Sequence, residues 1–259
     1  MKNISRLMTA FLAMVLLFSA AGGILTGKAL ETQAWEENIL VADPIGTFGV
    51  ELELIEIVSF QDNLEDVPEI AWNMGVGATD KVKAWFTWED GGHVHFAAEG
   101  GINGKDCTKA MFKDLKNLRE VNFNGAFHTE QAESMKEMFY GCKKLEKLDV
   151  STLNTGNVKS FYGMFQNCRK LTELDLTTFD TANATNVSRM FSSCGKLETL
   201  KVDGWNTENV INVEAMFMNC WNLKDLDLTG WNVDSVKYRG GFLDRDKTIN
   251  GEAWKKFFD

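Results

Sequence analysis

One 26-residue pattern occurs four times in succession between residues 138 and 241. The four copies begin with Met138, Met164, Met190 and Met216. A degenerate first copy begins at Met111 and carries one inserted residue near Ala126. A repeat of this length has apolar residues at fixed positions but cannot bury them alone, so neighbouring copies must cover one another. The period therefore predicts a solenoid of about five units over residues 111–241.

Each copy contains two kinds of apolar spacing. Apolar residues recur at separations of three or one from Val158 to Leu171, and Leu174-Asp175-Leu176 then alternates. The first spacing is typical of a short helix or 3₁₀ turn, and the alternation is typical of a strand. Superposed copies would align these strands in parallel, about 4.8 Å apart. We therefore expect an α/β, β-rich leucine-rich-repeat stack with a parallel sheet.

The string Phe-x-x-Cys-x-x-Leu-x-x-Leu-x-Leu, found in four consecutive copies, resembles the bacterial surface leucine-rich repeats of the BspA type. The words KVKAWF and AAEGGINGKDCTKAMF, upstream of the repeats, are similar to the module that precedes the repeats in that family. The chain departs from the commoner leucine-rich pattern at the ninth position, where an apolar residue precedes Asn or Asp. The residues concerned are Leu153-Asn154, Phe179-Asp180, Trp205-Asn206 and Trp231-Asn232. The resemblance implies a surface protein that binds host proteins, extracellular matrix or neighbouring bacteria.

Residues 1–29 have the features of an export signal. Lys2 and Arg6 precede an uncharged run from Leu7 to Gly27. A signal peptidase could cut at Ser19-Ala20-Ala21, within the run, or at Gly27-Lys28-Ala29, at its end. The run approaches about 20 residues, so an uncleaved membrane anchor is the alternative. Either form predicts an extracellular or cell-surface protein.

Residues 30–110 lack the period and form a separate acidic capping module. The segment from Leu30 to Asp80 holds twelve carboxylates and no Lys or Arg. Without residues 1–29 the chain would carry 24 basic against 37 acidic residues, a net charge of −13. Such a surface argues against nucleic acid and anionic lipid as partners.

Alternation predicts three strands in this module. The first runs over Val50–Leu54 and extends toward Phe60. Residues 82–86 and 93–96 form a hairpin around a turn at residues 89–92. The module should cover Met111 and Phe112 at the open end of the repeats.

At the other end, residues 242–259 are expected to form a C-terminal cap. Phe242 and Leu243 occupy the Met and Phe positions of the pattern, but Asp246 falls where the other copies have Cys. A charge cannot join a buried column, so the period should end there, with Trp254, Phe257 and Phe258 covering the last copy.

Four cysteines recur at the same position of the pattern: Cys142, Cys168, Cys194 and Cys220. Stacked copies would spread them over roughly 14 Å, which is too far for one zinc ion. Leu115 fills this position in the first copy, so we expect buried, reduced thiols that pack like apolar residues. Cys107 lies outside the pattern and is the candidate accessible thiol.

His93-x-His95 with Glu99 is the one group that suggests metal chemistry. Both imidazoles would face the same side of a strand, in a string that looks like the metal-binding string of cupin barrels. The glycine expected six residues before His93 is Thr87, the later glycine is misplaced, and no second His-bearing motif supplies further ligands. We therefore expect a structural hairpin and neither a metal nor a cofactor.

Outward positions of the expected strands form a polar, mainly acidic face, which would either be simply solvated or bind a partner. The candidate binding residues are Lys147, Asp149, Glu173, Asp175, Lys201, Asp225, Asp227 and Trp221. Trp221 occupies a position held by Lys143, Arg169 or Gly195 in the other copies. It is either an exposed anchor or, as we prefer, packs under the C-terminal cap.

These observations favour a secreted or cell-surface binding protein without catalytic activity, with another protein or cell-surface macromolecule as partner. Two alternatives remain: an extracellular metal-dependent enzyme using His93, His95 and Glu99, and a structural envelope component without an exchangeable ligand. The chain shows no serine-protease-like triad, phosphate-binding glycine loop or catalytic carboxylate pair.

Overall fold

The computed structural model describes residue 45 and residues 51–69, 71–74, 81–88, 91–105, 107–223, 225–244 and 247–258. The expected export signal over residues 1–29 lies outside the described residues, as do Glu89-Asp90 and Asp246. The described residues hold no helix that is both long enough and apolar enough to cross a membrane.

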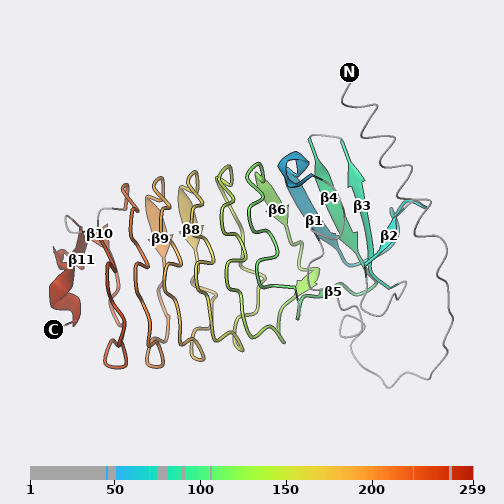
Figure 1. Cartoon of the computed structure of the whole chain (residues 1–259). Helices are drawn as coiled ribbons and strands as arrows, with labels where there is room; N and C mark the ends of the chain where they lie inside the picture. The colour runs from blue at the N-terminus through green and yellow to red at the C-terminus, as the bar shows by residue number, and fades with distance from the viewer. Residues whose placement is uncertain are drawn as a thin grey trace.

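The described chain forms short strands joined by many turns. The strands are β1 (Ile57–Gln61), β2 (Trp72–Asn73), β3 (Lys83–Thr87), β4 (His93–Ala97), β5 (Ile102–Asn103), β6 (Glu120–Asn122), β7 (Phe127–His128), β8 (Glu173–Asp175), β9 (Thr199–Lys201), β10 (Asp225–Leu226), β11 (Thr248–Ile249) and β12 (Glu252–Ala253). Between residues 51 and 258, helix is confined in the described residues to the 3₁₀ helices η2 (Leu52–Leu54) and η3 (Trp254–Phe258). Figure 1 shows a mixed sheet at the N-terminal end, followed by a row of narrow chain loops that ends at β10, β11 and the C-terminus.

The N-terminal sheet has the order β2-β3-β4-β1-β6. Strands β3 and β4 pair antiparallel, which confirms the predicted hairpin. Strand β1 lies between β4 and β6 and is parallel to both, so β6 of the first repeat unit completes this sheet. The start predicted for the first strand, Val50–Leu54, is wrong, because Leu52–Leu54 form the 3₁₀ helix η2. The predicted extension toward Phe60 coincides with β1, which begins at Ile57.

The predicted α/β leucine-rich-repeat solenoid with one parallel sheet is wrong. The described strands fall into four separate small sheets, and in the repeat region only β8 and β9 of adjacent units pair with each other. The segment at Leu148-Asp149-Val150, expected to be a strand by its position in the repeat, does not form one. The segments expected to be short helices or 3₁₀ turns are turns, in which N–H groups such as those of Met164 and Cys168 donate to the carbonyl three residues back.

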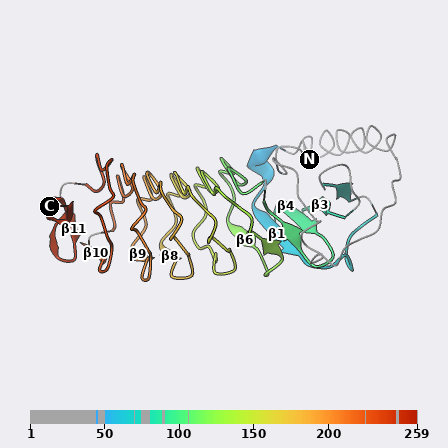
Figure 2. The same cartoon turned by 90° about the horizontal axis from the view of Figure 1, so that it is seen from below.

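A ladder of backbone hydrogen bonds explains why no helix forms. The N–H groups of Phe161, Gly163, Phe165 and Asn167 donate to carbonyls 25 residues further along the chain, at 2.9–3.0 Å. An α-helix would need the same N–H groups for carbonyls four residues back. Equivalent bonds recur from unit to unit, and isolated parallel bridges join Ser134, Ser160, Asn186, Asn212 and Tyr238 in turn. Successive units thus lie side by side through their turns, as the view in Figure 2 also shows.

The buried side chains form one core from Ile45 to Ile249. Phe139, Phe165, Phe191 and Phe217 stack with ring centroids 5.4–5.8 Å apart. At the far end Phe242 meets Phe217 and Phe258 edge to face, at 5.2 and 5.1 Å. The C-terminal segment therefore contacts the last ring of the column.

The four repeated cysteines are free and buried, which confirms the predicted thiols. Cys107 is also buried, so the prediction of an accessible thiol there is wrong.

The side chains of Asn154, Asp180, Asn206 and Asn232 cap their own turns by accepting a hydrogen bond from the N–H two residues later, at 2.9–3.1 Å. Side chains also join the units: Asn157, Asn183 and Asn209 donate to backbone carbonyls of the preceding unit at 2.7–2.8 Å.

Candidate functional site

The strand segments of the repeat units present one face to solvent. In β8, Glu173 and Asp175 are exposed whereas Leu174 between them is 2% exposed. The same alternation places Lys147 and Asp149 on this face in the preceding unit and Thr199 and Lys201 in the following one. Because neighbouring units are in register, side chains of equivalent position lie next to one another. We call this surface the strand face.

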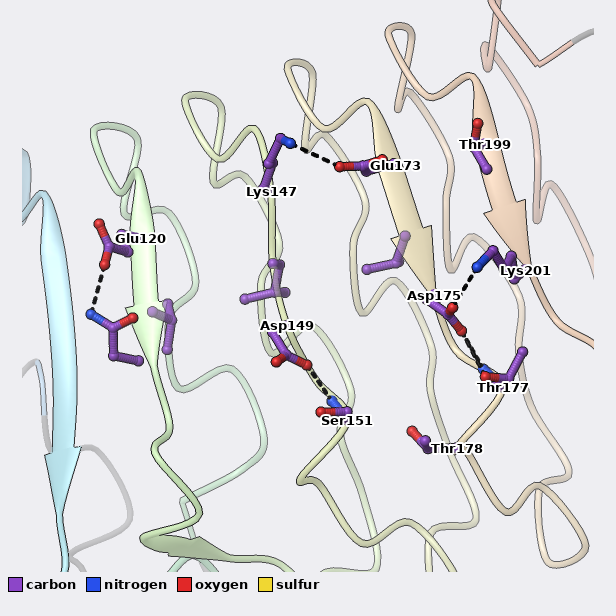
Figure 3. Close-up of a pocket in the computed structure, with 14 residues that line it drawn as sticks. Glu120, Lys147, Asp149, Ser151, Glu173, Asp175, Thr177, Thr178, Thr199 and Lys201 are labelled. Atoms are coloured by element: carbon purple, nitrogen blue, oxygen red, sulfur yellow. Dashed lines mark hydrogen bonds and ion pairs between the residues drawn. The ribbon is translucent and has the colours of Figure 1, made fainter.

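A hollow of about 670 Å³ lies on the strand face and spans four units from β6 to β9. Figure 3 shows its polar side chains projecting from these neighbouring segments. The lining residues are Glu120, Val121, Asn122, Lys147, Leu148, Asp149, Ser151, Glu173, Leu174, Asp175, Thr177, Thr178, Thr199 and Lys201.

Two ion pairs cross between units within the hollow. Lys147 Nζ lies 3.0 Å from Glu173 Oε1, and Lys201 Nζ lies 2.9 Å from Asp175 Oδ2 (Figure 3). The hydrogen bond from Lys201, followed by those from the Thr177 hydroxyl and N–H, lowers the pKa of Asp175 to about 2. The same pair raises the pKa of Lys201 above its usual value. Both partners are charged at neutral pH, and the pairs bridge neighbouring units; because all four side chains are more than half exposed, each pair contributes little to stability.

Asp149 lies between these two pairs and is held by its own turn. Its Oδ1 accepts a hydrogen bond from the Ser151 N–H at 2.9 Å. Hydrogen bonds from the Ser151 side chain and backbone lower the pKa of Asp149. No ion pair of the described residues neutralises Asp149, which leaves a fixed negative charge in the hollow.

At the β6 side, Asn122 connects the hollow with the N-terminal sheet. Its Nδ2 donates to Glu120 Oε1 at 2.7 Å and to Ser59 Oγ at 3.3 Å. Ser59 Oγ in turn lies 2.8 Å from His93 Nε2. Several lining residues were not among the predicted binding residues, and Glu120 and Asn122 are the polar ones from the first repeat unit. Glu120 and Asn122 occupy the same repeat positions as Lys147 and Asp149, a signal that the degenerate first copy obscures.

The structure brings five of the predicted binding residues together in the hollow: Lys147, Asp149, Glu173, Asp175 and Lys201. Asp227 has the same local bonding as Asp149, through Thr229, but lies outside the lining. The side chain of Asp225 lies outside the described residues.

Trp221 is not covered by the C-terminal segment. The residue is 67% exposed, so the preferred prediction of packing under the cap is wrong. Its indole lies over the preceding unit, where a Cβ built on Gly195 would be 2.8 Å from ring atom Cε3. The glycine therefore leaves the space that the indole occupies.

The candidate metal ligands are arranged as parts of the sheet. The rings of His93 and His95 stack at 3.7 Å, and that of His95 also stacks on Trp85 at 4.8 Å. His95 Nε2 lies 3.1 Å from Thr87 Oγ1. Burial, and next the neighbouring His93, lowers the pKa of His95 to about 4.

Glu99 follows the end of β4 and accepts a hydrogen bond from the Leu64 N–H at 3.3 Å. The structure does not bring Glu99 together with the two imidazoles. In the described part of the chain, no group of three or more His, Cys, Asp or Glu side chains is placed to hold a metal ion.

The geometry defines a repeat protein of in-register turns, with a polar hollow on one face. A family model described as "Mycoplasma protein of unknown function, DUF285" matches residues 106–231 and 172–256. Together these segments cover more than half of the chain, which therefore belongs to this family. The match overturns the resemblance to BspA-type leucine-rich repeats, because the matching family is a different one. No curated protein and no solved structure matches the chain significantly.

Proposed function

We propose that the chain is a binding protein without catalytic activity, which recognises a segment of another protein or cell-surface macromolecule through the strand face. The observation that carries the proposal is the hollow of about 670 Å³, to which four consecutive units contribute side chains. Its size and openness suit an extended segment lying across the units rather than an enclosed small molecule. The N-terminal sequence, in which Lys2 and Arg6 precede an uncharged run, has the features of an export signal and so supports a role outside the cell or at its surface.

The chemistry of the hollow favours a partner with cationic and hydrogen-bond-donating groups. Four carboxylates and two lysines line it, so negative charge is in excess. Both lysines are engaged by Glu173 and Asp175, whereas Asp149 keeps a fixed, ionised carboxylate.

A charge reversal at the centre of the hollow tests the proposal. We expect Asp149→Lys to weaken binding of a partner, captured from envelope or extracellular-matrix fractions and then purified, by about tenfold or more. Asp227→Lys is the matched control, since Asp227 makes the same turn hydrogen bond outside the hollow. Titration calorimetry of both variants and the wild type gives the comparison.

Equal binding by wild type and Asp149→Lys would exclude the strand face as the recognition surface. Absence of any partner in both fractions would favour a structural envelope component. The alternative of a metal-dependent enzyme has less support, because the imidazoles of His93 and His95 stack on each other and form hydrogen bonds with neighbouring hydroxyls.

A further inference from the structure

The turns that precede the strand-face segments of three consecutive units carry exposed cations at two consecutive positions of the repeat. These positions hold Lys143-Lys144, Arg169-Lys170 and Gly195-Lys196 in three consecutive units, and Trp221-Asn222 in the next. We call the exposed cations Lys143, Lys144, Arg169 and Lys196 the basic ridge. The ridge is unusual in a chain whose formal net charge is −10.

The charges of the basic ridge are not neutralised within the described protein. Lys170 lies 2.9 Å from Glu146 and so neutralises that carboxylate. Glu173 is engaged by Lys147, and Glu198 accepts a hydrogen bond from Asn222 at 3.1 Å. Across the described residues, no carboxylate lies within ion-pair distance of the four ridge cations. The ridge therefore presents four unpaired cations over three adjacent units.

An exposed aromatic ring ends the row. Trp221 holds the position of Lys143 and Arg169, is 67% exposed, and lies over Gly195 of the preceding unit. Lys247 Nζ donates to the Trp221 carbonyl at 2.9 Å and fixes the backbone there. A large indole exposed at a fixed position is a common feature of binding surfaces.

We propose that the basic ridge and Trp221 bind a linear, carboxylated polysaccharide that runs along the row of units. Carboxylates of successive sugars would lie against the lysines and the Arg169 guanidinium, whose planar fork can bind a carboxylate through two N–H groups. The C–H face of one sugar ring would pack on the indole of Trp221. Adjacent units are about one strand spacing apart, roughly 4.8 Å, so the cations form a line rather than a cluster.

The charge density of the surface favours this polymer over nucleic acid. A DNA duplex carries a charge about every 1.7 Å of its axis and relies on many phosphate contacts. The ridge offers four free cations, and the carboxylates of Glu146, Glu173 and Glu198 lie in the same units. A sugar chain with at most one charge per ring matches four cations without bringing dense charge against those acids.

This surface differs from the strand face in position and charge, and the inference does not depend on the proposed function. The ridge is formed by the turns before the strands, whereas the hollow lies along the strands themselves. Asp149→Lys should leave binding by the ridge in place.

Binding of the full chain to polygalacturonate at low salt tests the proposal. We expect a variant with Lys143→Gln, Lys144→Gln, Arg169→Gln and Lys196→Gln to bind about tenfold or more weakly. The control variant loses the same number of charges from exposed positions elsewhere, through Lys105→Gln, Lys109→Gln, Arg189→Gln and Lys237→Gln. The control should change the affinity by less than about twofold, and circular dichroism should show that both variants are folded.

Two single substitutions separate the contribution of the Trp221 indole to binding from that of the basic ridge. Trp221→Ala should weaken binding by about fivefold without changing its salt dependence, because no charge is lost. Gly195→Ala should have a similar effect, because its Cβ would displace the indole.

The proposal is overturned if the wild type does not bind polygalacturonate, or if the ridge and control variants lose affinity equally. Tighter binding to a single-stranded oligodeoxynucleotide, or to vesicles of anionic phospholipid, would overturn it as well.

Discussion

Each repeated cysteine donates a hydrogen bond inside the core. The Sγ atoms of Cys142, Cys168, Cys194 and Cys220 lie 3.0–3.1 Å from a Phe carbonyl of the preceding unit. The comparison with Leu115 predicts burial correctly but attributes it to apolar packing alone. The thiol adds a donor that leucine lacks, a role that the sequence pattern does not contain.

The buried thiols should make the free energy of unfolding fall with rising pH in the alkaline range. Burial raises the pKa of Cys220 from 9.0 to about 12, and burial raises those of Cys142, Cys168 and Cys194 as well. Above pH 9 the unfolded chain therefore binds fewer protons than the folded one. The stabilisation is complete below about pH 9 and is lost as the pH rises toward 12. Urea unfolding between pH 8 and 11 should show this decline.

Lysine and tyrosine titrate in the same pH range, so a substitution is needed to isolate the contribution of one thiol to the pH dependence of stability. Cys194→Ala should make the decline in unfolding free energy shallower by about 1.4 kcal/mol per pH unit, the value for one proton. Leu197→Ala in the same unit removes a fully buried side chain but no titrating group, so its slope should equal that of the wild type. An unchanged slope in Cys194→Ala would contradict a protonated, buried thiol.

At the scale of the element, each unit turns twice through left-handed backbone. The first position is occupied by Glu137, Gly163, Arg189, Ala215 and Gly241, with φ of 52–63°, and the second by Gly141, Asn167, Ser193 and Asn219, with φ of 63–76°. Apolar residues three apart suit either a helical turn or this arrangement, so the spacing alone did not decide between them. Glycine and asparagine at recurring positions were the available signal against a helix.

Arg189 and Arg169 give opposite predictions for substitution by glycine. Arg189 has a φ of 56° and an exposed side chain, so Arg189→Gly should raise the unfolding free energy by about 0.5–1 kcal/mol. Arg169 is also exposed but is not among the left-handed residues, so Arg169→Gly should lower it by about 0.5–1 kcal/mol. Urea denaturation measures both. Destabilisation by both glycines would contradict the strain assigned to Arg189.

Across the whole molecule, features formed by residues close in sequence could be predicted, whereas contacts between residues far apart in sequence could not. The period, the β3–β4 hairpin and five residues of the hollow follow from local patterns. The pairing of β1 with β6 joins residues about 60 positions apart and leaves no local signal. The family assignment failed for a related reason: the apolar positions resemble leucine-rich repeats, but they do not reveal which partner each N–H finds.

Phe60 couples the N-terminal sheet to the repeat units. It is fully buried, and its ring centroid lies 5.4 Å from that of Phe96 in the sheet. The centroids of Phe123 and Phe127, from the first repeat unit, lie at 5.6 and 4.6 Å. One ring thus packs against both regions, which share a single core.

Removal of this ring should destabilise the two regions together. Phe60→Ala is expected to lower the unfolding free energy by about 3–5 kcal/mol, because a large cavity opens where the regions meet. Hydrogen exchange should then rise in peptides from both β4 and residues 111–145. Trp88→Ala is the control, since Trp88 belongs to the same N-terminal region but is 58% exposed, and it should change stability by less than about 0.5 kcal/mol. Faster exchange confined to residues 81–97 would show that the sheet unfolds independently of the repeats.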